Sequence, residues 1–195
     1  TTSYTIHLLT VVLNNQFFAA FLSPTIASTL YYTKTIPLSL LQPTLAAHAL
    51  AILTAYPLYS ALFPPELVFG PRCNCSLASC FAIETACTAL LAVLCSLVVT
   101  LVPDSRYRYR SVLKSVLIGV SIRICMNLSI AKTGSSMNFM IAAAWFGYNG
   151  ELLSAEALVY YASAILGGAM GTLSFHYGLL AWKAGGSKGK KKKVD

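Results

Sequence analysis

Long apolar segments separated by short polar ones dominate the chain. Five of them are long enough to cross a bilayer as a helix, which takes roughly 20 residues. They are 4–22, 38–63, 77–102, 111–130 and 157–182. Two further apolar segments, 23–32 and 138–147, are too short to cross. This pattern predicts an all-α polytopic membrane protein.

The second short segment is the most informative part of the chain. It follows a Gly-Ser-Ser turn at 134–136 and begins at Asn138, and a complete apolar span lies on either side of it. Backbone at membrane depth that is not part of a full helix is tolerated only where protein or a watery cavity satisfies its hydrogen bonds. We therefore expect 138–147 to be a re-entrant half-helix that lines a site or a pore.

The first short segment repeats the second. Alignment of 22–32 with 137–147 pairs the residues that begin each segment, Ser23, Pro24 and Thr25 with Asn138, Phe139 and Met140. Paired interrupted segments in the two halves of a membrane protein point to its functional site. Two apolar stretches can also be alike by chance in a chain that is 56% hydrophobic, and this alternative stays open.

The second half of the chain resembles an aquaporin. The resemblance is carried by TGSSMN at 133–138, by the short apolar segment with Trp145, and by EALVYYASAILGGAMGTL after it. The nearest branch is the divergent group of plant small basic intrinsic proteins and animal superaquaporins. Because the resemblance covers most of the chain, it implies an aquaporin-like inverted-repeat bundle with two half-helices, about 23–32 and 138–147. On this alignment the first of the family's six spans is missing, so we expect further chain before residue 1.

The resemblance also assigns candidate pore residues. The family's two Asn-Pro-Ala motifs correspond to Ser23, Pro24 and Thr25 and to Asn138, Phe139 and Met140. The narrow filter corresponds to Met126, Ser135 and Ile141. Since the first Asn, the second Pro and the usual filter Arg are all replaced, this filter is expected to be apolar and poor in hydrogen-bond donors.

Asn138 has the chemistry for a pore motif. Its oxygen can cap backbone N–H groups while its NH₂ donates into a pore. Two half-helices with their N-termini at the midplane would present positive dipole ends, which disfavour cations and orient a neutral molecule. A plain N-cap without a pore is the alternative.

Composition and charge agree with this topology. The mean hydropathy is +0.67 and only 10% of the residues are charged, which excludes an ordinary soluble domain. The net charge of +8 is clustered and does not indicate nucleic-acid binding. Basic residues gather after the first short segment, between the spans 77–102 and 111–130, and in the C-terminal tail. By the positive-inside rule these regions, including the C-terminus, are cytoplasmic.

Several residues inside the spans need an explanation. Glu84 is a costly intramembrane carboxylate, and the resemblance implies that it holds the backbone of a re-entrant loop. The three His are scattered without metal-ligand spacing, so we predict that they are core or interface residues with hydrogen-bond partners, and we predict no metal or cofactor.

Cys73 and Cys75 lie in a loop on the non-cytoplasmic side. A disulfide between them and a weak metal-binding signal are both open interpretations. The sequence Gly167-x-x-x-Gly171 predicts close helix packing within the monomer rather than dimerisation.

The chain thus divides into a transmembrane domain, 1–182, and a basic tail, 183–195, too polar and glycine-rich to fold. Lys192 and Lys193 resemble a dilysine signal for retention in the endoplasmic reticulum, which indicates the endoplasmic reticulum membrane or another intracellular membrane.

Two functions are open. One is an aquaporin-like channel for water or small neutral solutes, with the homo-tetramer implied by the family. The other is a pore-degenerate structural subunit of a larger membrane complex. No nucleophile with a base or metal set is apparent, so we expect no enzyme activity.

Overall fold

The computed structural model describes residues 24–34, 36–64, 70–102 and 108–190. Within these ranges the protein is all-helical, with no strand. The helices are α2 (Pro24–Tyr32), α3 (Leu38–Leu62), α4 (Leu77–Leu101), α5 (Arg108–Thr133), α6 (Phe139–Tyr148) and α7 (Ala155–Lys190). The predicted span 4–22 and the motif residue Ser23 lie outside the described residues.

Four of the helices are long and apolar enough to cross a membrane. They are Leu38–Leu62, Leu77–Leu101, Val112–Thr133 and Ala155–Trp182. Each falls within a few residues of a predicted span, so the prediction of a helical polytopic membrane protein is confirmed for the described part of the chain. The two short apolar helices, α2 and α6, also lie where the sequence places them.

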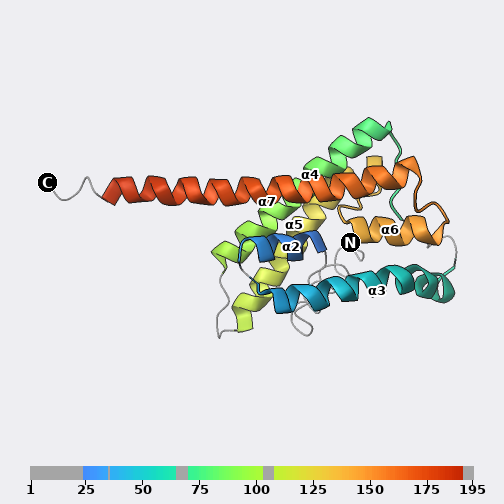
Figure 1. Ribbon diagram of the computed structural model, residues 1–195, viewed down its shortest axis with the longest axis horizontal. Coiled ribbons are helices and arrows are strands. Elements are labelled where there is room, and N and C mark those ends of the chain that lie inside the picture. Colours follow the sequence, from blue (N-terminus) through green and yellow to red (C-terminus); the bar gives the residue numbers. More distant parts are fainter. Residues whose placement is uncertain (1–23, 35, 65–69, 103–107, 191–195) are drawn as a thin grey trace.

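The short helices occupy the interior of the arrangement. In Figure 1, α2 and α6 lie between α7 and α3, while α4 and α5 run at an angle to α7. The packing agrees, since α2 and α6 both contact α3 and α7. Thr29 Oγ1 of α2 is 2.6 Å from Thr172 Oγ1 of α7, and this hydrogen bond ties α2 to the long helix.

The closest helix packing joins α4 to α7 through small residues. A Cβ atom at Gly171 would lie 2.4 Å from the Ala89 carbonyl oxygen, and one at Gly167 would lie 2.5 Å from the Thr85 carbonyl oxygen. Backbones can approach this closely only where a helix carries no side chain. The glycines therefore serve packing within the monomer, as the sequence predicts.

The C-terminal tail differs from the prediction. The sequence predicts an unfolded segment from residue 183, but α7 continues to Lys190 and projects beyond the other helices (Figure 1). No proline interrupts α7, so the helix can propagate from the preceding span although 183–190 contains three glycines. Lys192 and Lys193 lie outside the described residues.

Gly171 and Gly178 of α7 provide a matched test of this packing. We expect Gly171→Ala to lower the free energy of unfolding by about 1–3 kcal/mol, because its Cβ would meet backbone of α4 that cannot rotate away. Gly178→Ala meets nothing within 4 Å and should raise stability by up to about 1 kcal/mol through helix propensity. Unfolding in mixed micelles with increasing SDS measures both. Equal changes in the free energy of unfolding of the two variants would contradict the close α4–α7 contact.

Candidate functional site

The turn between α5 and α6, residues 133–138, is the irregular segment on which the candidate site depends. Three of its residues have left-handed backbone, Gly134 (φ 65°), Ser135 (φ 57°) and Met137 (φ 43°). Such a conformation costs on the order of 1–3 kcal/mol for a residue other than glycine and persists only where the surroundings fix it. The contacts made by this turn therefore decide whether α6 can begin where it does.

Glu84 of α4 supplies the principal contact. Its side chain is 1% exposed, and its Oε2 accepts a hydrogen bond from the Met137 backbone N–H at 2.7 Å. Oε1 accepts a hydrogen bond from the Thr133 hydroxyl, and the Ser136 N–H also bonds to the carboxylate. A buried carboxylate is tolerated when donors surround it in this way. These contacts confirm that Glu84 holds the backbone of this turn.

Thr133 fastens the turn to a second helix. Its carbonyl oxygen accepts a hydrogen bond from the Tyr160 hydroxyl of α7, and both residues are buried. Its single hydroxyl proton is shared between Glu84 and the Ser129 carbonyl, which lies at 3.1 Å, and its oxygen accepts from the Ser135 N–H at 3.2 Å. Tyr160 was not among the residues that the sequence singled out, because one tyrosine in an apolar span carries no signal of what it contacts.

The segment 70–76 covers the other side of the turn. The Asn74 N–H donates to the Lys132 carbonyl at 2.8 Å. A Cβ at Gly134 would lie 2.9 Å from the Arg72 backbone nitrogen, so this position requires glycine for space as well as for its φ. The turn is thus held by α4, by α7 and by the segment 70–76.

Asn138 caps the start of α6. Its side-chain oxygen accepts from the Met140 N–H at 3.0 Å, its φ and ψ are extended, and the residue is 6% exposed. This is the N-cap geometry expected of asparagine. The capping role predicted for Asn138 is confirmed.

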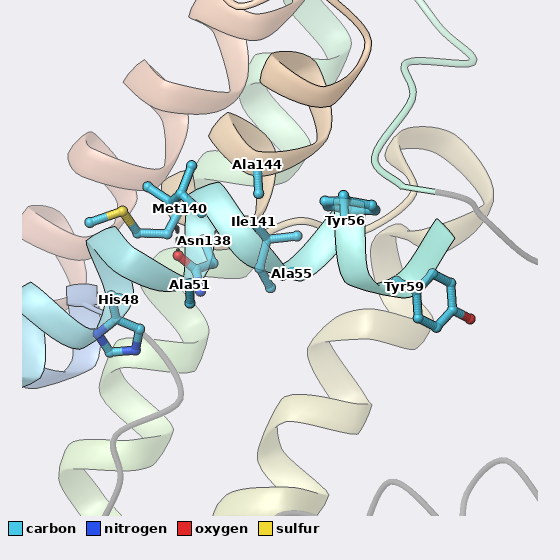
Figure 2. Close-up of a pocket in the computed structure, with 10 residues that line it drawn as sticks. His48, Ala51, Ala55, Tyr56, Tyr59, Asn138, Met140, Ile141 and Ala144 are labelled. Atoms are coloured by element: carbon cyan, nitrogen blue, oxygen red, sulfur yellow. Dashed lines mark hydrogen bonds between the residues drawn. The ribbon is translucent and has the colours of Figure 1, made fainter. Parts of the chain in front are cut away.

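Asn138 also borders a cavity between α3 and α6. The cavity has a volume of about 340 Å³. Its polar lining comes from His48, Asn138 and the tyrosines of α3, and its apolar lining includes Met140, Ile141 and Ala144 (Figure 2). Such a volume lies at the lower end of the range of about 300–1,000 Å³ that small-molecule sites occupy.

His48 differs from the prediction of satisfied histidines. Its Nδ1 is buried and has no hydrogen-bond partner among the residues that the structure describes. The sequence could not reveal this, since the polar residues of α3 are not gathered on one face and its pattern does not tell which face meets α6. His176 contacts the rings of Tyr32 and Tyr177 instead, and His7 lies outside the described residues.

A second cavity joins the beginnings of the two short helices. It has a volume of about 570 Å³ and lies among α2, α3 and α7. Pro24 and Thr25, the described residues of the first motif, line it together with Phe139 from the second motif. The structure therefore brings residues of both motifs to one place, although Asn138 and Met140 line the other cavity.

The three filter residues do not line one cavity. Ile141 lines the cavity beside Asn138. Met126 packs against the buried cluster that includes Leu91 and Cys125. Ser135 is 8% exposed within the turn, and its Oγ has no partner in the described part of the chain.

Comparison with known proteins leaves the site to be interpreted from its own geometry. No protein-family model and no curated protein matches the chain. Within the described ranges, no group of three or more His, Cys, Asp or Glu side chains could hold a metal ion.

Substitutions at Glu84 test the hydrogen bonds that hold the turn. We expect Glu84→Gln to be destabilising, since an amide cannot accept from every donor, and Glu84→Ala to be worse, since it leaves buried N–H groups unpaired. Each unpaired group costs about 1–3 kcal/mol. Hydrogen exchange of peptides covering 133–138 should accelerate in the same order.

The exposed Glu151, which precedes α7, offers the control. Glu151→Ala should change stability by no more than about 0.5 kcal/mol. Unchanged protection of the 133–138 peptides in Glu84→Ala would rule out the anchoring role of Glu84.

Proposed function

We propose that this protein is a membrane channel for passive transport of water or small neutral solutes, with an atypical apolar filter. The observation that carries the proposal is the convergence of the two short helices. Pro24 and Thr25 at the start of α2 line one cavity with Phe139 at the start of α6. The adjacent Asn138 lines the first cavity, between α3 and α6. Neither short helix is long enough to cross a membrane, so each presents a terminus inside the bundle.

Those termini would favour neutral solutes over cations. The N-terminus of a helix carries a partial positive charge from its unpaired N–H groups. Asn138 satisfies one of these groups at α6 and adds its own side chain to the cavity wall. A cation passing here would meet like charge, while a neutral molecule could exchange hydrogen bonds with polar groups on the wall.

The walls make tight binding of a solute unfavourable. Met140, Ile141 and Ala144 offer no hydrogen bonds, and the polar groups of this cavity are few. A solute that enters must give up part of its hydration, which costs free energy. The proposed transport is therefore slower than in a pore lined by donors, and it suits small molecules that are weakly hydrated.

The resemblance to aquaporins supports the remaining parts of the proposal. It includes the inverted-repeat arrangement of α2 and α6, a homo-tetramer in an intracellular membrane such as the endoplasmic reticulum, and a cytoplasmic C-terminus. The contact between Glu84 and the turn at 133–138 agrees with what the resemblance implies.

One observation favours the structural subunit as a second candidate. Tyr56 of α3 packs against Trp145 at 5.3 Å and against Tyr148 at 5.9 Å between ring centroids. These contacts bridge α3 and α6 beside the first cavity, since Tyr56 also lines it. Aromatic rings that remain in contact would close this end, as expected of a bundle kept for packing in a larger complex.

Light scattering of proteoliposomes in a stopped-flow instrument tests the channel. Under osmotic, glycerol and urea gradients we expect shrinkage faster than in empty vesicles. Ile141→Arg should reduce it because a long charged side chain enters the cavity wall, and Ile141→Leu, which conserves volume, should not. Asn138→Asp keeps the cap but loses the NH₂ donor, so a reduction of about 2–10-fold is expected from one lost hydrogen bond.

The decisive comparison is with vesicles that contain no protein. Permeability equal to theirs, from protein shown to be folded and inserted, would eliminate the channel and leave the structural subunit.

A further inference from the structure

Two thiols lie close together in the segment that covers the turn at 133–138. Cys73 Sγ and Cys75 Sγ are 3.8 Å apart, and both side chains are partly exposed. The Cys73 thiol donates to the Cys75 carbonyl at 3.1 Å, and the Cys75 thiol lies 3.7 Å from the Lys132 carbonyl oxygen. The two sulfur atoms already face each other across a single intervening residue.

Their surroundings fix the backbone of the pair. Asn74, the residue between them, donates its N–H to the Lys132 carbonyl at 2.8 Å. The Cys73 N–H donates to the Glu156 carboxylate at the start of α7. Both cysteines pack against the buried cluster that contains Cys80 of α4 and Phe146 of α6. The backbone of the pair is therefore tied by hydrogen bonds to α5 and α7.

We propose that Cys73 and Cys75 form a reversible dithiol–disulfide site. A disulfide requires a sulfur–sulfur distance of about 2.05 Å, so the two sulfur atoms, now 3.8 Å apart, must move together to form it. A bond across so short a loop restricts the unfolded chain little and is not a structural staple. Exposed disulfides of this kind exchange readily with small thiols.

Oxidised glutathione is a sufficient oxidant for this site. The thiolate of one cysteine attacks a glutathione sulfur and releases one glutathione thiolate, which gives a mixed disulfide. The second cysteine then attacks the protein sulfur of that disulfide and releases the second glutathione. Two electrons pass to glutathione, and the two thiol protons end on the two glutathione thiols. Reduced dithiothreitol reverses the reaction by the same two exchanges.

The rate should depend on pH. Desolvation, followed by the adjacent Cys73 thiol, raises the pKa of Cys75 above its ordinary value. Less thiolate is then present at neutral pH, so closure should accelerate as the pH rises toward that pKa.

Closure would act on the candidate pore. It removes the thiol hydrogens that face the Cys75 and Lys132 carbonyls, and Lys132 immediately precedes the turn that positions Asn138. This consequence rests on the proposed channel function, whereas the disulfide itself does not.

Counting thiols by mass after alkylation tests the site independently of transport. The chain contains six cysteines. Protein equilibrated with oxidised glutathione, then alkylated with N-ethylmaleimide, should carry two fewer adducts than the reduced protein, and dithiothreitol should restore them. Cys73→Ser and Cys75→Ser should each abolish this paired loss.

Cys80→Ser is the matched control, since Cys80 is fully buried in the same cluster. It should retain the loss of two adducts, and Cys73→Ala and Cys75→Ala repeat the test should a serine variant fold poorly. The proposal would be overturned if the wild type retained all adducts or kept a lasting mixed disulfide with glutathione. It would also be overturned if the Cys73 variants still lost two adducts. If the disulfide forms but neither redox state is permeable, the channel fails and the redox site stands.

Discussion

The carboxylate of Glu84 is the constraint on which the rest of the arrangement depends. An ionisable group in an apolar span is tolerated only if donors surround it. The backbone N–H groups of 136 and 137 in turn have no helix to satisfy them, because the chain has left α5 and not yet entered α6. These N–H groups donate to the Glu84 carboxylate, so the buried carboxylate gains donors and the backbone gains an acceptor. The position of Asn138, and with it the start of α6, follows from this exchange of hydrogen bonds.

Two glycines of α7 bring this helix close to α4, the helix that carries Glu84. Gly167 and Gly171 bring the α7 backbone close to α4, near Thr85 and Ala89. Glu84 immediately precedes Thr85 on α4, and Tyr160 lies two turns before Gly167 on α7. Both side chains can therefore reach the same residue, Thr133. Close packing of two spans and anchoring of the turn are thus one structural feature rather than two.

The sequence predicts well the features that depend on local chemistry. The four described spans follow from their length and apolar composition, and the start of α6 follows from Asn138. The contact of Glu84 with the turn is implied by the resemblance to aquaporins, while the cost of a buried carboxylate indicates only that Glu84 needs partners. The sequence fails where the answer depends on which face of a helix meets a neighbour. His48 lies on α3, whose polar residues are not gathered on one face, so no pattern marks it as a cavity residue. Met126 and Ile141 are aligned as one filter, yet packing directs the first to a buried cluster and the second to a cavity.

The choice between a channel and a structural subunit comes down to how the first cavity is closed. One of its polar atoms, His48 Nδ1, is buried without a partner among the described residues and would be costly to keep inside a bundle that serves only for packing, because an apolar residue of similar size would fill the space without an unpaired nitrogen. The rings of Tyr56 and Trp145 that bridge α3 and α6 are held by contacts worth about 0.5–1.5 kcal/mol each beyond their buried area. A buried nitrogen without a partner among the described residues, beside a closure made of side-chain contacts, supports the proposed passage of small molecules over permanent packing.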